Sequence, residues 1–241
     1  MRSKQILGLL IPLACAALFV RLGFWQISRH LQRAEYNARV SARLVTDPVL
    51  FTSLPPDTGL VRGQRVTLSG RFLYDRQQVL AGRVSEGRPS VHLITPVERE
   101  GNDTLDPVAD EGNDTLVAVV RGWVWSADAA GVDRSRFREA DSVSLRGYAV
   151  PLPLEGLPAP TDASRPLRSL NVAALAARFA RPVSPYMVVM TSDSAYRADS
   201  VPHRLGPPVL AAGSHKSYAI QWFAFAVIAV VGGVLLFRRK L

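Results

Sequence analysis

The chain has 241 residues and a formal net charge of +9, with one cysteine and four histidines. Five of the positive charges lie in Arg2, Lys4 and the terminal run 238–240, so the rest of the sequence is only mildly basic. Because no Lys- or Arg-rich run is interleaved with aromatic residues, the composition excludes a typical nucleic-acid-binding protein. One cysteine cannot form an internal disulfide, and the spacing of the histidines argues against a stable zinc or copper site made by protein ligands alone.

The first predicted element is a membrane helix over residues 5–24. Its apolar run, Ile6–Val20, follows basic residues, and Trp25 stands where interfacial aromatic side chains lie. The competing interpretation is a cleaved signal peptide with a small-residue site at Ala14–Ala16. Because the apolar run continues past that site, we expect a retained anchor.

Beyond Trp25 the helical pattern continues to about Leu44 as a basic, amphipathic extension. Gln26, Arg29 and Arg33 share one face of it. Arginines at this depth suit carboxylates, because the guanidinium fork matches them, and they suit lipid phosphates equally well.

From Gly63 onward the pattern predicts short strands separated by turn-forming residues. We expect the strands at Arg65–Phe72, Gln78–Leu80, Ser90–Val97, Leu116–Trp125, Ser142–Val150 and Tyr186–Thr191. A short helix is expected over Leu170–Phe179, capped by Asn171 or by an earlier residue. The predicted fold class is therefore an α+β membrane protein. Two terminal transmembrane helices flank a mainly antiparallel β domain with short helices, over residues 25–214, whose strands form a sheet or a partly closed barrel.

An internal duplication lies between two of these strands, where Glu100–Leu105 returns as Glu111–Leu116. Its oxygen-rich side chains are compatible with calcium, but the ligand order of an EF-hand and its closing glutamate are missing. A polar loop lengthened by duplication is the favoured interpretation.

The second predicted membrane helix spans residues 215–237 and is followed by a basic tail, residues 238–241. With basic residues at both ends of the chain, the positive-inside rule places both termini in the cytoplasm and residues 25–214 on the outer side.

His215 opens this helix above a seam of Ala219, Trp222, Ala226 and Gly233. Small residues on one face allow close approach either of the first helix or of a flat ligand, and a neutral imidazole can ligate haem iron. The alternative is an interfacial histidine above a plain helix-packing seam.

Arg121-Gly122-Trp123 lies within a predicted apolar strand. A glycine between these two large residues indicates a turn with close backbone approach, whose tryptophan either seals the core or contacts a ligand. No nucleophile elbow, phosphate-binding loop or dinucleotide motif occurs in the sequence, which therefore carries no enzyme signature.

Four motifs in this order resemble the Surfeit locus protein 1 family. They are Leu22-Gly23-Phe24-Trp25-Gln26 with Arg29, then Ile94-Thr95-Pro96, then Val119–Val124, and finally His215 with Tyr218–Ile220 and Trp222-Phe223. The resemblance covers nearly the whole chain, including both terminal helices. Departures from the family pattern are Ser214 before the histidine, Pro89 after Gly87, Trp125 after the tryptophan motif, and the duplicated loop.

The resemblance implies a non-enzymatic assembly factor for haem-copper cytochrome c oxidase that helps haem a reach the catalytic subunit, with haem a synthase as a further partner. It implies that His215 is the haem ligand, with Trp25, Gln26, Arg29 and Trp222 as further candidate cofactor-binding residues. Arg121, Gly122 and Trp123 match a structural motif of the family. The lack of a long Arg- and Ser-rich presequence favours a bacterial cytoplasmic membrane. The alternative function is a membrane-tethered scaffold that binds oxidase subunits or other assembly proteins without binding haem; an outer-face hydrolase ranks third.

Overall fold

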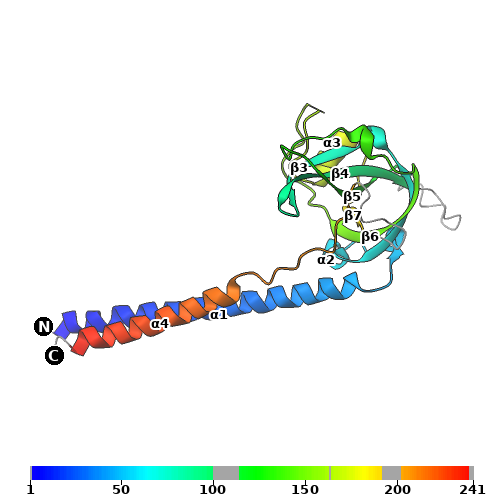
Figure 1. The fold of residues 1–241 in the computed structure, drawn as a ribbon. Helices are drawn as coiled ribbons and strands as arrows, with labels where there is room; N and C mark the ends of the chain where they lie inside the picture. Colours follow the sequence, from blue (N-terminus) through cyan, green and yellow to red (C-terminus); the bar gives the residue numbers. More distant parts are fainter. Residues whose placement is uncertain (1, 100–113, 163, 192–201, 239–241) are drawn as a thin grey trace. The chain divides into compact units, whose positions relative to one another are not determined.

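The computed structural model describes residues 2–99, 114–162, 164–191 and 202–238. It contains a pair of long helices and a β domain (Figure 1), which form two compact units, residues 1–39 with 209–241 and residues 40–208. Four α-helices occur in the described residues: α1 (Arg2–Leu44), α2 (Thr58–Val61), α3 (Val172–Phe179) and α4 (His215–Arg238).

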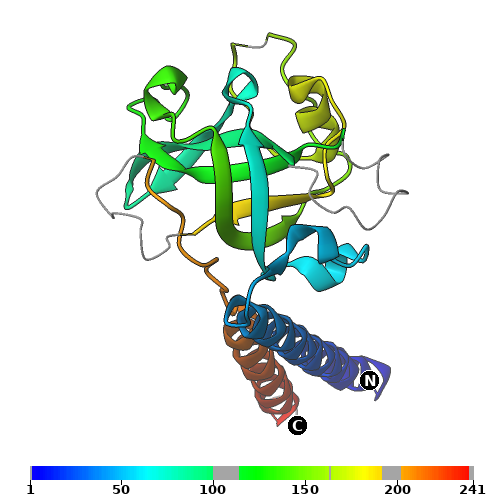
Figure 2. The ribbon, with the colours of Figure 1, turned by 90° about the vertical axis from the view of Figure 1, so that its right-hand side faces the viewer.

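The β domain is built on one mixed sheet that closes on itself. Its strands are β1 (Val49–Leu50), β2 (Arg65–Phe72), β3 (Gln78–Ser85), β4 (Arg88–Arg99), β5 (Val117–Trp125), β6 (Ser142–Pro151) and β7 (Tyr186–Met190). The order is β1-β2-β6-β7-β5-β4-β3, and an additional β2–β4 pairing closes the ring from β2 through β6, β7, β5 and β4. Figure 2 shows the strands curling into this barrel. Among the strands that the structure describes, the β1–β2 and β5–β7 pairs are parallel and the other pairs are antiparallel, which confirms a mainly antiparallel, partly closed barrel.

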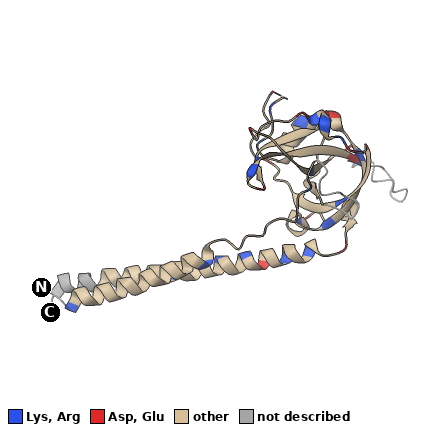
Figure 3. Ribbon diagram, in the orientation of Figure 1, with Lys and Arg blue, Asp and Glu red and all other residues tan. Residues whose placement is uncertain are grey.

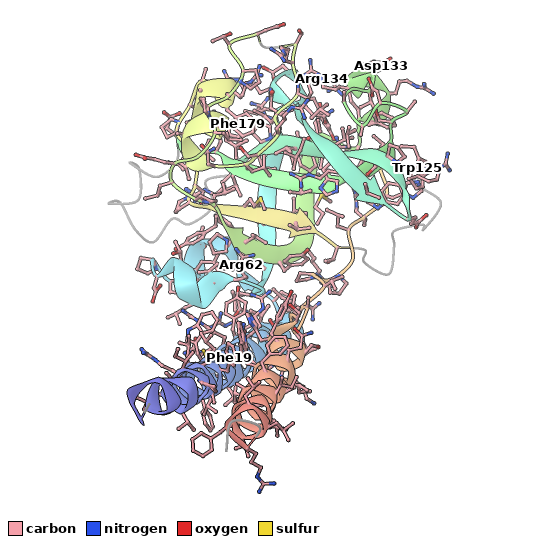
Figure 4. The ribbon with its side chains drawn as sticks, turned by 90° about the vertical axis from the view of Figure 1, so that its left-hand side faces the viewer. Phe19, Arg62, Trp125, Asp133, Arg134 and Phe179 are labelled. Carbon is pink, nitrogen blue, oxygen red and sulfur yellow. The ribbon has the colours of Figure 1, made fainter. Side chains whose placement is uncertain are left out.

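The barrel interior and its outer face carry separate apolar clusters, because neighbouring residues of a strand point to opposite faces. Val117, Val119 and Val188 belong to the interior cluster, whereas Val120 and Val189 belong to the outer one. Leu175 and Phe179 of α3 complete the outer cluster, and Phe179 is labelled in Figure 4. As predicted, Asn171 caps α3: its side chain accepts a hydrogen bond from the Ala174 N–H at 2.8 Å.

Helices α1 and α4 are long and apolar enough to cross a membrane by length and composition. Figure 3 shows few charged residues along their apolar stretches and several arginines on the later part of α1. α1 runs without a break to Leu44, as the sequence predicted. The chain is thus an α+β membrane protein with apolar helices at its two ends.

The duplicated segment and the turn at Gly122 are two further predictions made from the sequence. The first copy of the duplicated segment and residues 111–113 lie outside the described residues. The structure therefore does not test the calcium-binding interpretation of this segment. The predicted turn at Gly122 is wrong: β5 continues through it, and Arg121 forms a bulge opposite β4, between the Val120–Ile94 and Gly122–Leu93 pairs.

Candidate functional site

His215 is the first residue of α4, immediately after a glycine turn. Gly213 has a φ of +75°, in the left-handed region that glycine enters without strain. The Tyr218 N–H donates to the Ser214 carbonyl at 3.1 Å and so closes the first helical turn. His215 therefore lies on an ordered helix terminus.

A hydrogen bond joins His215 to the other long helix. Its Nδ1 lies 2.8 Å from Oε1 of Gln26 on α1. Because an amide oxygen only accepts, this contact favours the imidazole tautomer with the proton on Nδ1. Nε2 of that tautomer keeps its lone pair. No hydrogen bond to Nε2 occurs among the residues that the structure describes.

Further side chains of α1 hold the segment that leads into α4. Arg33 Nε donates to the Ala211 carbonyl at 3.3 Å, and Asn37 Nδ2 donates to the carbonyls of Leu210 and Ala211 at 3.3 and 3.1 Å. With Gln26 these residues lie along one face of the helix, at intervals of seven and four. The extension of α1 thus positions His215 in two ways. Gln26 contacts the imidazole ring, and Arg33 and Asn37 hold the backbone segment that precedes α4.

The small-residue seam below His215 packs against α1. A Cβ added to Gly233 would lie 2.7 Å from Pro12, and one added to Gly23 would lie 2.7 Å from the Phe223 ring. Trp222 packs against Phe19 with ring centroids 5.6 Å apart; Phe19 is labelled in Figure 4. Of the two partners that the sequence left open for this face, α1 packs against it in the structure.

Trp25, directly before Gln26, forms an exposed cation–π pair with Arg29, which lies about one helical turn after Gln26. The Arg29 guanidinium carbon lies 5.6 Å from the centre of the Trp25 ring, and Nη1 donates to Gln32 at 3.2 Å. Both Trp25 and Arg29 are exposed. Arg29 is therefore accessible to an anionic group, such as a carboxylate or a lipid phosphate.

The residues around His215 fit one side of a haem site. A side chain at Gly213 would lie against the His215 ring, since a Cβ there comes within 3.6 Å of Nε2. Glycine leaves that edge of the imidazole uncovered by its own chain. Haem iron binds a ring nitrogen of histidine that has a free lone pair, while a partner on the other ring nitrogen sets the tautomer. Nε2 of His215 meets this description.

The second group of predicted residues lies in the β domain. Arg121 is fully buried on β5, where Nη1 donates to Gln77 at 2.7 Å and Nη2 to Glu139 at 2.7 Å. Its guanidinium lies over the Tyr74 ring, at 4.9 Å from the ring centre. Arg121 therefore has its charge and donors satisfied within the protein.

Glu139 is shared between two arginines. Arg204 donates to Oε1 at 3.0 Å and to Oε2, while Arg121 donates to Oε1. Burial raises the pKa of Glu139, but the hydrogen bonds and positive charges of Arg204 and Arg121 outweigh it and hold the pKa below its ordinary value. The carboxylate therefore remains ionised between its two partners.

The sequence reasoning missed Gln77, Glu139 and Arg204, the partners of Arg121. They lie 44, 18 and 83 residues away along the chain, so no local spacing links them. The only available signal was Arg121 itself, since an arginine inside an apolar strand requires a buried acceptor. Gly122 does have the close backbone approach that was predicted, because a Cβ there would overlap the His203 carbonyl oxygen.

Comparison with known proteins agrees with the motifs. The model of the SURF1 family matches residues 13–227. A SURF1-like protein of Monosiga brevicollis is 28% identical over 126 residues, which are 52% of this chain and 48% of that protein. Uncharacterized SURF1-like proteins of Mycobacterium bovis and Mycobacterium tuberculosis are each 25% identical over 221 residues, covering 89% of this chain and 76% of theirs. The chain thus matches about half the length of the Monosiga protein and three quarters of the mycobacterial ones.

Proposed function

The chain belongs to the SURF1 family of oxidase assembly factors, and from this premise we propose that it helps haem a enter the catalytic subunit of cytochrome c oxidase. In this role it is not an enzyme. It holds haem a as cargo, and its partners are the haem-copper catalytic subunit and haem a synthase. The proposed location is a bacterial cytoplasmic membrane, with both termini in the cytoplasm and the β domain in the periplasm.

The observation that carries the proposal is the His215–Gln26 hydrogen bond of 2.8 Å. Gln26 orients the imidazole and sets its tautomer, so that Nε2 is the nitrogen available to iron. Partners of this kind commonly account for 10- to 100-fold in metal affinity. Trp25 and Arg29, on the exposed side of α1, supply an aromatic surface and a cation for the ring and carboxylates of the cargo.

The proposal is tested by expressing the full-length protein together with haem a synthesis and recording the absorption spectrum of the purified protein. We expect a haem spectrum in the wild type, none in His215→Ala, and binding weakened by roughly 10- to 100-fold in Gln26→Ala. His92→Gln is the matched control, because His92 belongs to the β domain and its removal leaves the α1–α4 contacts unchanged.

Oxidase assembly in cells separates this function from the alternative scaffold. If wild type and His215→Ala are equally colourless and both support assembly, haem handling is wrong and a scaffold role accounts for the family membership. If His215→Ala loses colour and assembly together while its membrane level is unchanged, the scaffold alone is insufficient.

A further inference from the structure

The segment Pro202–Leu205 pairs with the barrel at the Arg121-Gly122-Trp123 motif. The Trp123 N–H donates to the His203 carbonyl at 2.8 Å, and the His203 N–H donates back to the Trp123 carbonyl at 2.9 Å. The two residues thus form an isolated antiparallel bridge on β5. Among the described residues, it is the last backbone bridge between the chain and a strand before α4.

Gly122 makes this approach possible. Its φ of +156° lies at the edge of the region that side-chain-bearing residues rarely adopt. A Cβ at this position would overlap the His203 carbonyl and lie 3.3 Å from Pro202. Any larger residue therefore forces the Pro202–Leu205 segment away from β5.

The side chains on either side of the glycine contact the same segment. The Trp123 ring stacks on the His203 ring, with centroids 4.4 Å apart and an angle of 24° between the planes. Trp125, labelled in Figure 4, lies edge-on to Trp123 at 4.6 Å. The aromatic surface of the motif is therefore occupied by the chain itself.

Arg121 completes the contact through its backbone and its charge. Its carbonyl accepts a hydrogen bond from Arg204 Nη1 at 2.7 Å, and its guanidinium shares Glu139 with Arg204. The Arg204 side chain is only 6% exposed, so its hydrogen bonds are made out of water, where they are strong. All three residues of the motif thus converge on one short segment.

Residues 206–214, here named the tether, follow this segment and lead to His215. Leu205 packs on the outer apolar cluster, and the Tyr148 hydroxyl reaches the Gly206 carbonyl at 3.4 Å. We propose that Arg121-Gly122-Trp123 is a clasp that fixes the start of the tether on the barrel. It is a positioning motif, not a ligand site. The proposal does not rest on haem handling by His215.

Two variants test the clasp. Arg204→Ala removes the partner that the Pro202–Leu205 segment gives to Glu139 and leaves the Arg121–Glu139 pair in place. Gly122→Ala displaces His203 without changing any charge. Hydrogen–deuterium exchange of the full-length protein in nanodiscs should become about five- to tenfold faster in a peptide covering residues 202–214, the loss expected for one or two net hydrogen bonds. Arg204→Lys, which keeps the charge without the fork, should restore part of the protection.

Glu98→Gln is the control, because Glu98 pairs with Arg71 and Arg181 and, within the described part of the chain, has no ion pair with residues 202–205. It should leave exchange in that peptide unchanged. Oxidase assembly in cells should fall in Arg204→Ala and Gly122→Ala and remain in the control.

Wild-type exchange over residues 202–214 in both variants overturns the proposal. Equal acceleration across β2 and β6 also overturns it, because the motif then supports the whole barrel and not the tether. A haem spectrum that both variants retain would support haem binding by His215, whether or not the clasp proposal is correct.

Discussion

At the scale of single residues, the β domain treats the buried Arg121 and the half-buried His92 differently. Glu139 and Gln77 accept the hydrogen bonds of the buried Arg121 guanidinium and so compensate its loss of water contacts. His92 lies on β4 opposite Trp123 and has no acidic partner within the described part of the chain. Burial together with the nearby charge of Arg83 lowers its pKa to about 4. His92 is thus held neutral in the folded protein.

This state predicts a loss of stability in mild acid. The His92 pKa is about 4 in the folded protein and 6.5 in the unfolded chain, so the unfolded state binds more protons between these values. The free energy of unfolding should therefore fall as the pH drops from 6.5 to 4, by on the order of 2 to 3 kcal/mol from this residue. Urea titrations of the full-length protein in detergent at several pH values measure the change.

His92→Gln provides the comparison, since it cannot titrate. Subtracting its pH profile from that of the wild type removes the background from Glu98 and Glu139, whose pKa values are lowered by their arginine partners. A difference that is flat from pH 6.5 to 4 would show that His92 is hydrated or paired in the folded state.

Sequence reasoning reached the residues of the site but not their partners. His215 stood out because it opens an apolar helix, and Gln26 because it belongs to a motif near the other membrane segment. His215 and Gln26 are 189 residues apart in the sequence. Their hydrogen bond depends on how α1 and α4 are rotated about their axes and shifted along them relative to each other. The same holds for Glu139, which lies on no regular strand or helix and acquires its role only when the barrel closes.

At the scale of elements, the pairing of α1 with α4 depends on where glycine stands. Gly232 and Gly233 are neighbours in α4, yet a Cβ on Gly233 meets Pro12 at 2.7 Å whereas one on Gly232 meets nothing within 4 Å. Between helices in lipid, such close contacts replace the hydrophobic effect as the source of association. These two positions therefore form a natural matched pair.

We predict that Gly233→Leu separates the helices and Gly232→Leu does not. The axes should move apart by about 2 Å, within the range of interaxial distances that different contact residues produce. The measurement is the electron-spin distance between labels at Leu18→Cys and Val227→Cys, both exposed, in a Cys15→Ser background. Equal distances in the two variants would mean that the seam does not determine the pairing.

Most elements were predictable because their patterns are local. β2 has the predicted bounds, and α3 begins at the predicted cap. β3 extends past its predicted end because Gly82 permits a register shift, and Glu86 and Gly87, both at positive φ, form a tight turn into β4. The parallel pairing of β5 with β7 was not predictable, since it joins segments more than 60 residues apart whose apolar patterns specify no partner.

At the scale of the whole molecule, the order of weak motifs carried more information than any one of them. The tryptophan motif of α1, the β5 motif and the histidine of α4 lie far apart in sequence, and together they matched one family across residues 13–227. The two compact units divide at Arg39 and Pro208, because α1 continues past Trp25 and its extension donates hydrogen bonds to the carbonyls of Leu210 and Ala211. The compact units are defined by contacts between residues, whereas the membrane segments were predicted from hydropathy.

The topology gives a prediction at this scale. Basic residues flank the outer ends of both apolar helices, so both termini should lie in the cytoplasm and the β domain on the opposite side. Alkaline phosphatase fused within residues 100–113 should be active, and the same enzyme fused after Leu241 should be inactive. Activity of both fusions, or a mature N-terminus at Ala17, would contradict the two-anchor arrangement.

The contacts between α1 and α4 restrict how the lengths of these helices can change during divergence. Pro12 meets Gly233, Gly23 meets Phe223 and Gln26 meets His215, so the two helices run antiparallel and their contacts share one register. Deleting one residue between Pro12 and Gln26 turns every earlier side chain by about 100° and moves it off the seam. Only the loss or gain of whole heptads, made in both helices together, keeps the register. Each such step changes the span by about 10 Å, more than bilayers of different organelles differ in thickness. Insertions and deletions should therefore collect in the loops of the barrel, where the duplicated segment already stands.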